Sequence, residues 1–464
     1  MHLLNGSPMV STIAADAHYI QEVRDHYETY PYPLRDPERE KTYLRHDYSC
    51  ALDSLNYYHF SGKRDFSQGF RVLVAGGGTG DAIILLAEQL REMKADVVYL
   101  DISEASMQVA KDRAKIRELS NITWVHGSLL DAPKLVEGTF DFINCAGVLH
   151  HLTSPEGGLA ALASVLKDDG VMGLMLYAKY GREGVYQIQN LMRIVNKDEP
   201  NMQRKVDNCK AVLKHLPATN PFHALKRIIS DIETCGDVGI YDLLLHSHDV
   251  AYSIPDVYTF LSTSRLELGH LFFDQYTDIG NDLYRLESYF NDGSMAKLID
   301  TLSVQEKQAA AELMHGKIIK HAFYASRQKP SLPSLDDLDN VPSVSMMIHR
   351  GAYREICDIF KKASVGQEIT FNLYLMQHRV VKTLHSEQMF AAMDGHKSIG
   401  EILRDVRASY PANTKKPSIE ELKEEFALIF TAFNKLDWMF LRHKSAPGCR
   451  TIQELQSRVT NIWK

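Results

Sequence analysis

Three glycines spaced two residues apart give the strongest chemical signal in the sequence. The segment 72–80, Val-Leu-Val-Ala-Gly-Gly-Gly-Thr-Gly, is typical of a buried strand that turns abruptly into a helix. Residues without a Cβ permit such a turn and let a ligand lie against the backbone, and the amides at the helix start favour a carboxylate or phosphate. Gly76, Gly78 and Gly80 are therefore predicted to bind a cofactor, with a purely structural turn as the alternative.

The spacing around this turn argues against a dinucleotide. A Gly-x-Gly-x-x-Gly fingerprint counted from Gly76 would place the carboxylate of Asp81 against a pyrophosphate, where like charges repel. A zwitterionic amino-acid tail meets no such objection. Asp101 follows Gly80 by 21 residues, at the end of the next predicted strand, where a carboxylate can accept both hydroxyls of a ribose. A helix cap is the structural alternative for Asp101.

Polar side chains follow the fourth and fifth predicted strands. His150 and His151 come directly after the fourth, and the pKa of histidine lies near neutrality, as a general base requires. We predict base catalysis, preferably by His151, with a structural role as the alternative. Arg182 and Tyr186 follow the fifth strand, at the carboxyl edge where open α/β sheets bind ligands. They are predicted to face the reacting atom, with ordinary lid packing as the alternative.

Two further groups of residues could bind a ligand. Tyr27, Tyr30 and Tyr32 lie in a Tyr-Pro-rich segment that could cover the cofactor, and Tyr30 is the predicted contact; simple docking of the segment on the core is the alternative. The run 246–249, His-Ser-His-Asp, suggests a metal hairpin. Because no further ligand stands at a recognisable spacing, we predict no metal site.

The elements that must position these residues alternate between strand and helix. Strands are predicted at 70–75, 96–100, 122–125, 140–144 and 171–176, with helices between them. This alternation predicts an α/β fold, a Rossmann-like doubly wound sheet covered on both faces. Further core strands are expected at 266–273 and 321–324.

The segment 70–177 resembles the class I S-adenosylmethionine-dependent methyltransferases. Residues 72–80 match the first motif of that family, 101–102 the second, 127–131 the third, and 140–152 are very similar to the fourth. The resemblance implies S-adenosyl-L-methionine as the cofactor. It also implies cofactor contacts for the following residues: Asp101 on the ribose, Ile102 on adenine, Ser128 and Leu129 along the adenine edge, and Asn144 and Ala146 in the floor of the site.

Two positions depart from the family pattern. Val74 replaces a common acid, so Asp81 or a backbone carbonyl would have to hold the methionine amino group. Ser128 replaces an aspartate, so a hydroxyl or a backbone group would have to meet the adenine amino group.

A looser resemblance extends over more of the chain. The Tyr-Pro-rich N-terminus, the segment 180–186 and the run 243–252 are similar to bacterial methyltransferases with a C-terminal regulatory domain. Some relatives of that group methylate protein lysines, but the lysine acceptor is not carried over to this chain.

The chain is expected to contain several domains, since 464 residues exceed one ordinary hydrophobic core. We predict an N-terminal cap segment at 1–69, the cofactor-binding core at 70–326 with a helical insertion at about 185–250, and a linker at 327–344. Residues 345–464 are predicted to form a mostly helical, winged-helix-like domain for regulation or substrate recognition. Ser398-x-x-Glu401 and Ser418-x-x-Glu421 are predicted to open helices there as capping boxes.

Composition limits the location and the partners. A net charge of -7 argues against a general polyanion binder, and no apolar run approaches the length of a membrane span. The six cysteines are scattered, and the N-terminus lacks the pattern of a signal peptide, so we expect a cytoplasmic protein. Residues 144–147, Asn-Cys-Ala-Gly, replace the Asn/Asp-Pro-Pro-aromatic run of nucleic-acid amino methyltransferases, so no nucleic-acid acceptor is expected.

The sequence therefore predicts methyl transfer from S-adenosylmethionine to a small molecule or a protein side chain. The alternatives are a non-catalytic S-adenosylmethionine-binding regulatory protein, supported by the missing acid at Val74, and, less favoured, a nicotinamide oxidoreductase. The acceptor, the need for a base and the oligomeric state stay open.

Overall fold

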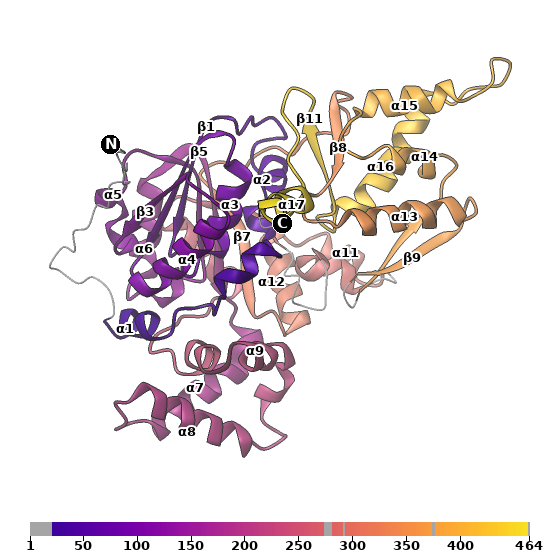
Figure 1. Ribbon diagram of the computed structural model, residues 1–464. Helices are drawn as coiled ribbons and strands as arrows, with labels where there is room; N and C mark the ends of the chain where they lie inside the picture. The colour runs from indigo at the N-terminus through magenta and orange to yellow at the C-terminus, as the bar shows by residue number, and fades with distance from the viewer. Residues whose placement is uncertain (1–20, 273–280, 291–292, 374–375, 463–464) are drawn as a thin grey trace, which may run out of the picture. The chain divides into compact units, whose positions relative to one another are not determined.

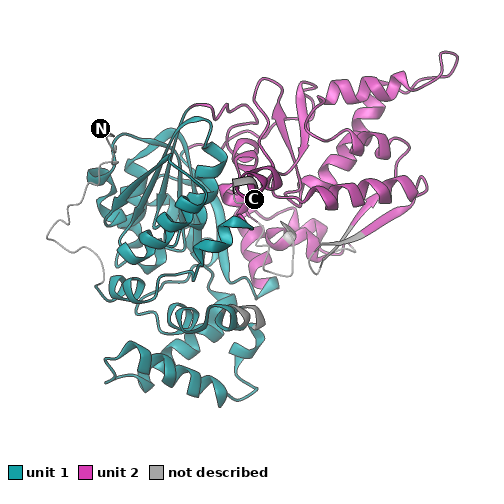
Figure 2. Cartoon of the chain, in the orientation of Figure 1, with its two compact units in different colours: residues 1–43, 69–268, 315–327 teal, residues 44–68, 269–314, 328–464 magenta. Residues whose placement is uncertain are grey.

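The computed structural model describes residues 21–272, 281–290, 293–373 and 376–462. The chain divides into two compact units (Figure 2): unit 1 contains residues 1–43, 69–268 and 315–327, and unit 2 contains residues 44–68, 269–314 and 328–464. Each unit is thus assembled from three separate stretches of the sequence.

A seven-stranded mixed sheet forms the centre of the predicted cofactor-binding region (Figure 1), with the strand order β3-β2-β1-β4-β5-β7-β6. Its strands are β1 Gln68–Ala75, β2 Lys94–Asp101, β3 Ile122–His126, β4 Phe140–Ala146, β5 Leu166–Tyr177, β6 Glu267–Leu271 and β7 Lys320–Ser326. The pairs β2/β3, β1/β4 and β4/β5 are parallel, which confirms the predicted Rossmann-like sheet. β7 runs antiparallel to β5, a direction that the strand–helix alternation does not predict because β7 lies beyond the alternating region.

Helices connect the parallel strands: α3 Asp81–Leu90, α4 Glu104–Ile116, α5 Ala132–Leu135 and α6 Pro155–Ser164. α3 begins at the glycine turn and is buried along almost its whole length. α4 begins at Ser103, whose hydroxyl accepts a hydrogen bond from the Ser106 amide as an N-cap. The core between helices and sheet contains the fully buried rings of Phe70, Phe140 and Phe142.

The segment predicted as a helical insertion follows β5 and is helical in the structure. It contains α7 Glu183–Val195, α8 Met202–Lys214, η6 Pro221–Ala224 and α9 Lys226–Leu244, with α10 Ile254–Ser262 after it. These helices bury a small core of their own that includes Val185, Ile188 and Phe222. In Figure 1, α7, α8 and α9 lie together as a group beside the sheet.

The N-terminal part of unit 1 consists of α1 Gln21–Thr29 and η1 Pro37–Lys41, and both elements contact α4. The remaining short elements of unit 1 are η3 Leu129–Asp131, η4 Leu149–His151 and η5 Tyr180–Arg182. η4 follows β4 and η5 follows β5, so both lie at the carboxyl edge of the sheet.

Unit 2 is mostly helical with two short antiparallel strand pairs, β8 Asn340–Val344 with β11 Met439–His443, and β9 Glu368–Leu373 with β10 Met376–Val381. Its helices are η2 Tyr48–Cys50, α2 Leu52–Tyr58, η7 Asn281–Tyr284, η8 Leu286–Tyr289, α11 Ala296–Ile299, α12 Val304–His315, α13 Arg350–Lys362, α14 Ser386–Ala391, α15 Ile399–Ala408, α16 Ile419–Asn434 and α17 Ile452–Ile462. Both predicted capping boxes are present, at the starts of α15 and α16.

The compact units do not follow the segments predicted from the sequence. β8 falls inside the predicted linker 327–344, because its residues pair with β11. The stretches 44–68 and 269–314 join unit 2, where the Tyr58 hydroxyl donates to Asp437 and the Tyr58 ring stacks on His270 at 3.5 Å. A separable domain at 345–464 and its winged-helix-like character stay predictions.

Within the described ranges, every helix is too short or too polar to cross a bilayer.

Candidate functional site

The glycine turn has the backbone geometry that the sequence predicts. Gly76 and Gly80 adopt φ values of 72° and 102°, in the left-handed region that favours glycine. A Cβ on Gly76 would lie 2.4 Å from Cγ2 of Val148, so the neighbouring chain is packed against the turn. The Gly78 amide donates to Oδ2 of Asp101 at 2.7 Å. The turn and the end of β2 are thereby joined directly.

Asp101 ends β2 and is 8% exposed. Its Oδ1 accepts from the Ser103 amide at 2.8 Å, so both carboxylate oxygens are fixed by backbone donors. Burial raises the pKa of the Asp101 carboxyl, while these amide bonds act in the opposite direction. Each oxygen keeps a lone pair beyond its amide bond, as acceptance of the two ribose hydroxyls requires.

The other predicted cofactor residues lie along the same edge of the sheet. Ile102 follows β2, and Ser128 accepts from the Leu130 amide as the N-cap of η3, beside buried Leu129. Asn144 pairs with Val74 across β1 and β4, and its buried Nδ2 makes no hydrogen bond within the ranges that the structure describes. Ala146 is exposed at the end of β4. The carboxyl ends of β1 to β4 thus bring these positions together, and a buried amide donor there fits a polar ligand.

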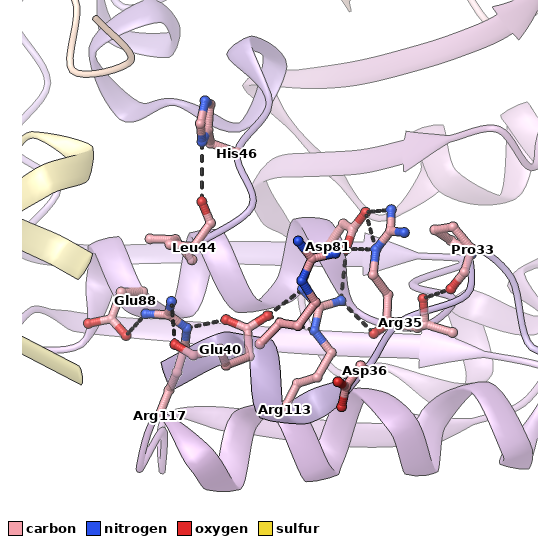
Figure 3. Close-up of polar contacts among 12 residues, drawn as sticks. Pro33, Arg35, Asp36, Glu40, Leu44, His46, Asp81, Glu88, Arg113 and Arg117 are labelled. Carbon is pink, nitrogen blue, oxygen red and sulfur yellow. Dashed lines mark hydrogen bonds and ion pairs between the residues drawn. The ribbon is translucent and has the colours of Figure 1, made fainter. Parts of the chain in front are cut away.

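Asp81 binds two arginine side chains. Oδ2 of Asp81 accepts from Nη2 of Arg35 at 2.6 Å, and Oδ1 accepts from Nη1 of Arg113 at 2.8 Å (Figure 3). Two guanidinium groups therefore already bind this carboxylate. A contact of Asp81 with a methionine amino group stays a prediction.

The same ion-pair network extends into the core (Figure 3). Glu40 of η1 accepts from Arg113 at 2.7 Å and also binds Arg117, which lies 3.4 Å from Glu88. All four side chains are almost fully buried. Buried charges are stable only when they are paired, so this network fixes η1 against α3 and α4.

The N-terminal segment contacts the turn through its backbone. Thr79 donates from Oγ1 to the Pro33 carbonyl at 2.7 Å, and a Cβ on Gly78 would lie 3.0 Å from the Tyr32 carbonyl. Tyr30 points elsewhere: its hydroxyl donates to Gln203 of α8 at 3.1 Å, and its ring packs on Tyr241. Residues 32 and 33 thus contact the turn, while a cover over the cofactor and a contact of Tyr30 with it stay predictions.

The residues predicted to act on the acceptor do come together. His150 packs against Tyr177 with ring centroids 3.9 Å apart, and the Arg182 guanidinium lies 3.5 Å from the centroid of the same ring. His151 lies next to His150, at 4.3 Å between centroids, and Tyr186 lies near Arg182. η4, β5 and η5 therefore build one aromatic and cationic cluster.

Residues from α1, from α9 and from the loop after α9 complete this cluster, and the sequence analysis did not predict their role. His246 stacks on His151 at 3.9 Å, although the sequence suggested it only as part of a metal hairpin. Tyr27 donates its hydroxyl to Asp242 at 3.2 Å and lies 3.4 Å from Nε2 of His246. No motif in the sequence identifies Asp242 as a site residue, although the adjacent run 243–252 is part of the looser family resemblance.

Burial controls the protonation of this cluster, which we term the histidine–tyrosine cluster (His26, Tyr27, His150, His151, Tyr177, Arg182, Tyr186, Asp242, His246 and Asp249). Burial lowers the pKa of His151 to about 4 and the pKa values of His150 and His246 well below the ordinary range. The imidazoles are therefore neutral at physiological pH. Nδ1 of His151 lies 3.0 Å from the His248 carbonyl, so Nδ1 carries the proton and Nε2 can accept one.

Metal ligation receives no support in this cluster. Among the described residues, the group of three side chains that could meet one ion is Asp337, Asp339 and His443 in unit 2. Asp339 is exposed and already forms an ion pair with Lys444 at 2.9 Å, whereas Asp337 and His443 are half-buried. The group therefore indicates an ordinary surface ion pair.

Comparisons with known proteins agree with this geometry. Residues 73–172 match a family described as a methyltransferase domain. An uncharacterized protein of Synechococcus sp. is 29% identical over 343 residues, which cover 73% of this chain and 77% of that protein. The tRNA 5-carboxymethoxyuridine methyltransferase of Escherichia coli is 34% identical over 115 residues, 25% of this chain and 42% of that enzyme. The chain thus matches less than half of the latter protein.

One solved structure resembles most of the chain. PKMT2 from Rickettsia typhi, determined in complex with AdoHcy, aligns with a TM-score of 0.58 over 87% of this chain and 76% of that one. Its sequence identity is 12%, so the likeness concerns the fold.

Proposed function

We propose that this chain, a member of the class I S-adenosylmethionine-dependent methyltransferases, methylates a small molecule or a protein side chain at the histidine–tyrosine cluster. The methyl donor is S-adenosylmethionine. The cluster lies after β4 and β5, at the same sheet edge as Gly76, Asp101 and Asn144. Donor and acceptor can therefore meet across the ends of these strands.

S-adenosylmethionine, when bound, supplies a methyl group on a sulfonium whose sulfur leaves without further activation. The protein then has to align the acceptor, exclude water and take up a proton from a hydroxyl or ammonium acceptor. The acceptor's lone pair forms the new bond to the methyl carbon as the carbon–sulfur bond breaks. In our proposal the proton released by the acceptor passes to Nε2 of His151.

The observation that carries this proposal is the state of His151. Its ring is buried and neutral, and the bond from Nδ1 to the His248 carbonyl leaves Nε2 as the basic nitrogen. A base with a lowered pKa is fully deprotonated at neutral pH but gives less driving force for proton transfer. It therefore suits an acceptor whose proton is lost as the new bond forms.

Labelled methyl transfer tests the proposal. The protein is incubated with methyl-labelled S-adenosylmethionine and a lysate separated into protein and small-molecule fractions, and label should enter one of them. His151→Gln should then lower turnover by roughly 100-fold or more, as expected for loss of a general base. Its affinity for S-adenosylhomocysteine should stay within about threefold of wild type, because only proton transfer is lost.

His223→Gln is the matched control, because His223 is exposed on η6 and hydrogen-bonds only to a nearby carbonyl among the described residues. This variant should turn over at the wild-type rate. Failure of the wild-type protein to label either fraction at saturating cofactor would contradict the proposed function. Equal rates for His151→Gln and wild type would leave the function intact but remove His151 from proton transfer.

A further inference from the structure

Arg182 carries a buried charge whose hydrogen-bonding capacity is only partly used. The side chain is 4% exposed, in η5 between β5 and α7. Among the described residues it forms an ion pair with Asp249, whose Oδ2 lies 3.9 Å from Nη2 of Arg182, beyond hydrogen-bonding distance. That oxygen accepts instead from Nε2 of Gln189 at 3.1 Å. Asp249 thus offsets the charge of Arg182 without satisfying its donors.

Nε and Nη2 of Arg182 have no hydrogen-bond partner among the residues that the structure describes. These two nitrogens form one edge of the guanidinium, which can donate two parallel hydrogen bonds to the two oxygens of a carboxylate. Leaving such donors buried without a partner costs about 1–3 kcal/mol each, and more for charged groups. Stacking on Tyr177 uses the face of the guanidinium and leaves this edge available.

Two neighbouring side chains, Tyr186 and His150, also contain polar atoms whose hydrogen-bonding capacity is not fully used. The Tyr186 hydroxyl interacts with the Arg182 guanidinium, but neither this hydroxyl nor the two ring nitrogens of His150 make a hydrogen bond of ordinary geometry within the described parts of the chain. His150 is fully buried and packs on the same Tyr177 ring as Arg182. The guanidinium edge and the Tyr186 hydroxyl present three N–H or O–H donors, and the one protonated nitrogen of His150, which packs on the other face of the Tyr177 ring, presents a fourth. The group that satisfies them has to be rich in acceptor oxygens.

We propose that Arg182, Tyr186 and His150 form a binding site for a carboxylate of the methyl acceptor. This inference rests on the proposed function, because it concerns what the acceptor presents to the histidine–tyrosine cluster. A bidentate bond to Arg182 orients the acceptor, so that its nucleophile is aligned with the methyl group next to His151. Asp242, which accepts from Tyr27 in the same cluster, can take up a proton and so limit the repulsion of an added anion.

Anion binding can be measured before any acceptor is known. Acetate is titrated into the complex of the protein with S-adenosylhomocysteine, with uncharged methyl acetate as the matched probe. We expect acetate alone to bind, with an affinity at least about 30-fold weaker in Arg182→Gln, since two charge-assisted hydrogen bonds are lost. Tyr186→Phe, which keeps the ring, should weaken acetate binding by about threefold to tenfold. Arg193→Gln, on the exposed face of α7, should bind acetate like wild type.

Two cofactor analogues distinguish a site for an acceptor carboxylate from a site for the carboxylate of the methionine tail. S-adenosylhomocysteine contains a carboxylate, whereas 5′-methylthioadenosine lacks the amino-acid tail. Arg182→Gln should bind both within about threefold of wild type, because the site is assigned to the acceptor. A loss of affinity for S-adenosylhomocysteine alone would assign Arg182 to the methionine tail and overturn the proposal. Equal acetate binding by wild type, Arg182→Gln and Tyr186→Phe, or no acetate binding, would also overturn it, and neither outcome depends on methyl transfer.

Discussion

The Tyr27 hydroxyl donates a 3.2 Å hydrogen bond to Asp242, a residue 215 positions away in the sequence. The backbone carbonyl of Tyr27 accepts from Oγ of Ser103 at 3.1 Å, directly after the predicted ribose-binding strand end. Glu28 extends this link by accepting from the amides of Glu104 and Ala105 at the start of α4. α1 therefore joins the start of α4 to Asp242 of α9.

Asp242 should make the stability of the protein depend on pH. Burial raises the pKa of this carboxyl from 3.8 to about 7, against the opposing effects of the Tyr27 bond and Arg182. The protonated form fits the folded state, so the stability from Asp242 is complete below pH 3.8 and is lost as the pH rises to about 7. Asp242→Asn should be more stable than wild type at pH 8 by up to about 4 kcal/mol.

Urea unfolding of both proteins between pH 4 and pH 8 tests this expectation. The difference in the free energy of unfolding should vanish near pH 4, where the wild-type carboxyl is largely neutral. The buried histidines change the free energy of unfolding with pH in the opposite direction. Because both proteins contain these histidines, their contribution cancels in the difference between wild type and Asp242→Asn. A difference that is constant across this pH range would show that Asp242 does not titrate with a raised pKa.

Asp101→Ala should weaken binding of S-adenosylmethionine by about 2–4 kcal/mol, because two charge-assisted bonds to the ribose are lost. Titration calorimetry measures the affinity directly. Asp96→Ala is the control on the same strand, since Asp96 is exposed and pairs with Arg71. If both variants bind like wild type, Asp101 serves only to hold the Gly78 and Ser103 amides.

Gly76→Ala should greatly reduce cofactor binding. The new Cβ would need a left-handed backbone and would lie 2.4 Å from Cγ2 of Val148, so the turn would have to move. Gly69→Ala is a matched control, because Gly69 has φ of 69° but no heavy atom within 4 Å of the added Cβ. Gly69→Ala should lose about 1 kcal/mol of stability, because alanine disfavours the left-handed backbone. Its affinity for the cofactor should be unchanged. Equal affinities for the two variants would contradict close packing at the turn.

Glu40→Gln should destabilise the protein by about 3–5 kcal/mol, because it leaves the buried guanidinium groups of Arg113 and Arg117 without their shared carboxylate. Glu38→Gln, in the same 3₁₀ helix, removes an exposed ion pair with Lys41 and should cost less than about 1 kcal/mol. Denaturant unfolding at low and high salt measures the free energy of unfolding of each variant against wild type. A similarly small effect for both would show that the network contributes little.

The sequence predicts three features correctly because they depend on local properties. These are the glycine turn, the end of β2 and the alternation of strands with helices. A missing Cβ, a fixed distance from Gly80 to Asp101 and the periodicity of apolar residues act over a few tens of residues. The capping boxes at Ser398 and Ser418 are local in the same way, and both are present.

The partners of charged and polar side chains were decided only by the tertiary structure. The sequence predicts that Asp81 contacts the cofactor, and only the packing of the chain shows that its carboxylate forms ion pairs with Arg35 and Arg113. Tyr30 and Tyr27 lie three residues apart, yet the first turns toward α8 and the second reaches Asp242. Such contacts depend on how distant helices cross, and a buried charge or hydroxyl binds whichever partner that crossing supplies. The sequence by itself therefore determined where the glycine turn forms, and the packing of α1 and α9 decided which residues join the histidine–tyrosine cluster.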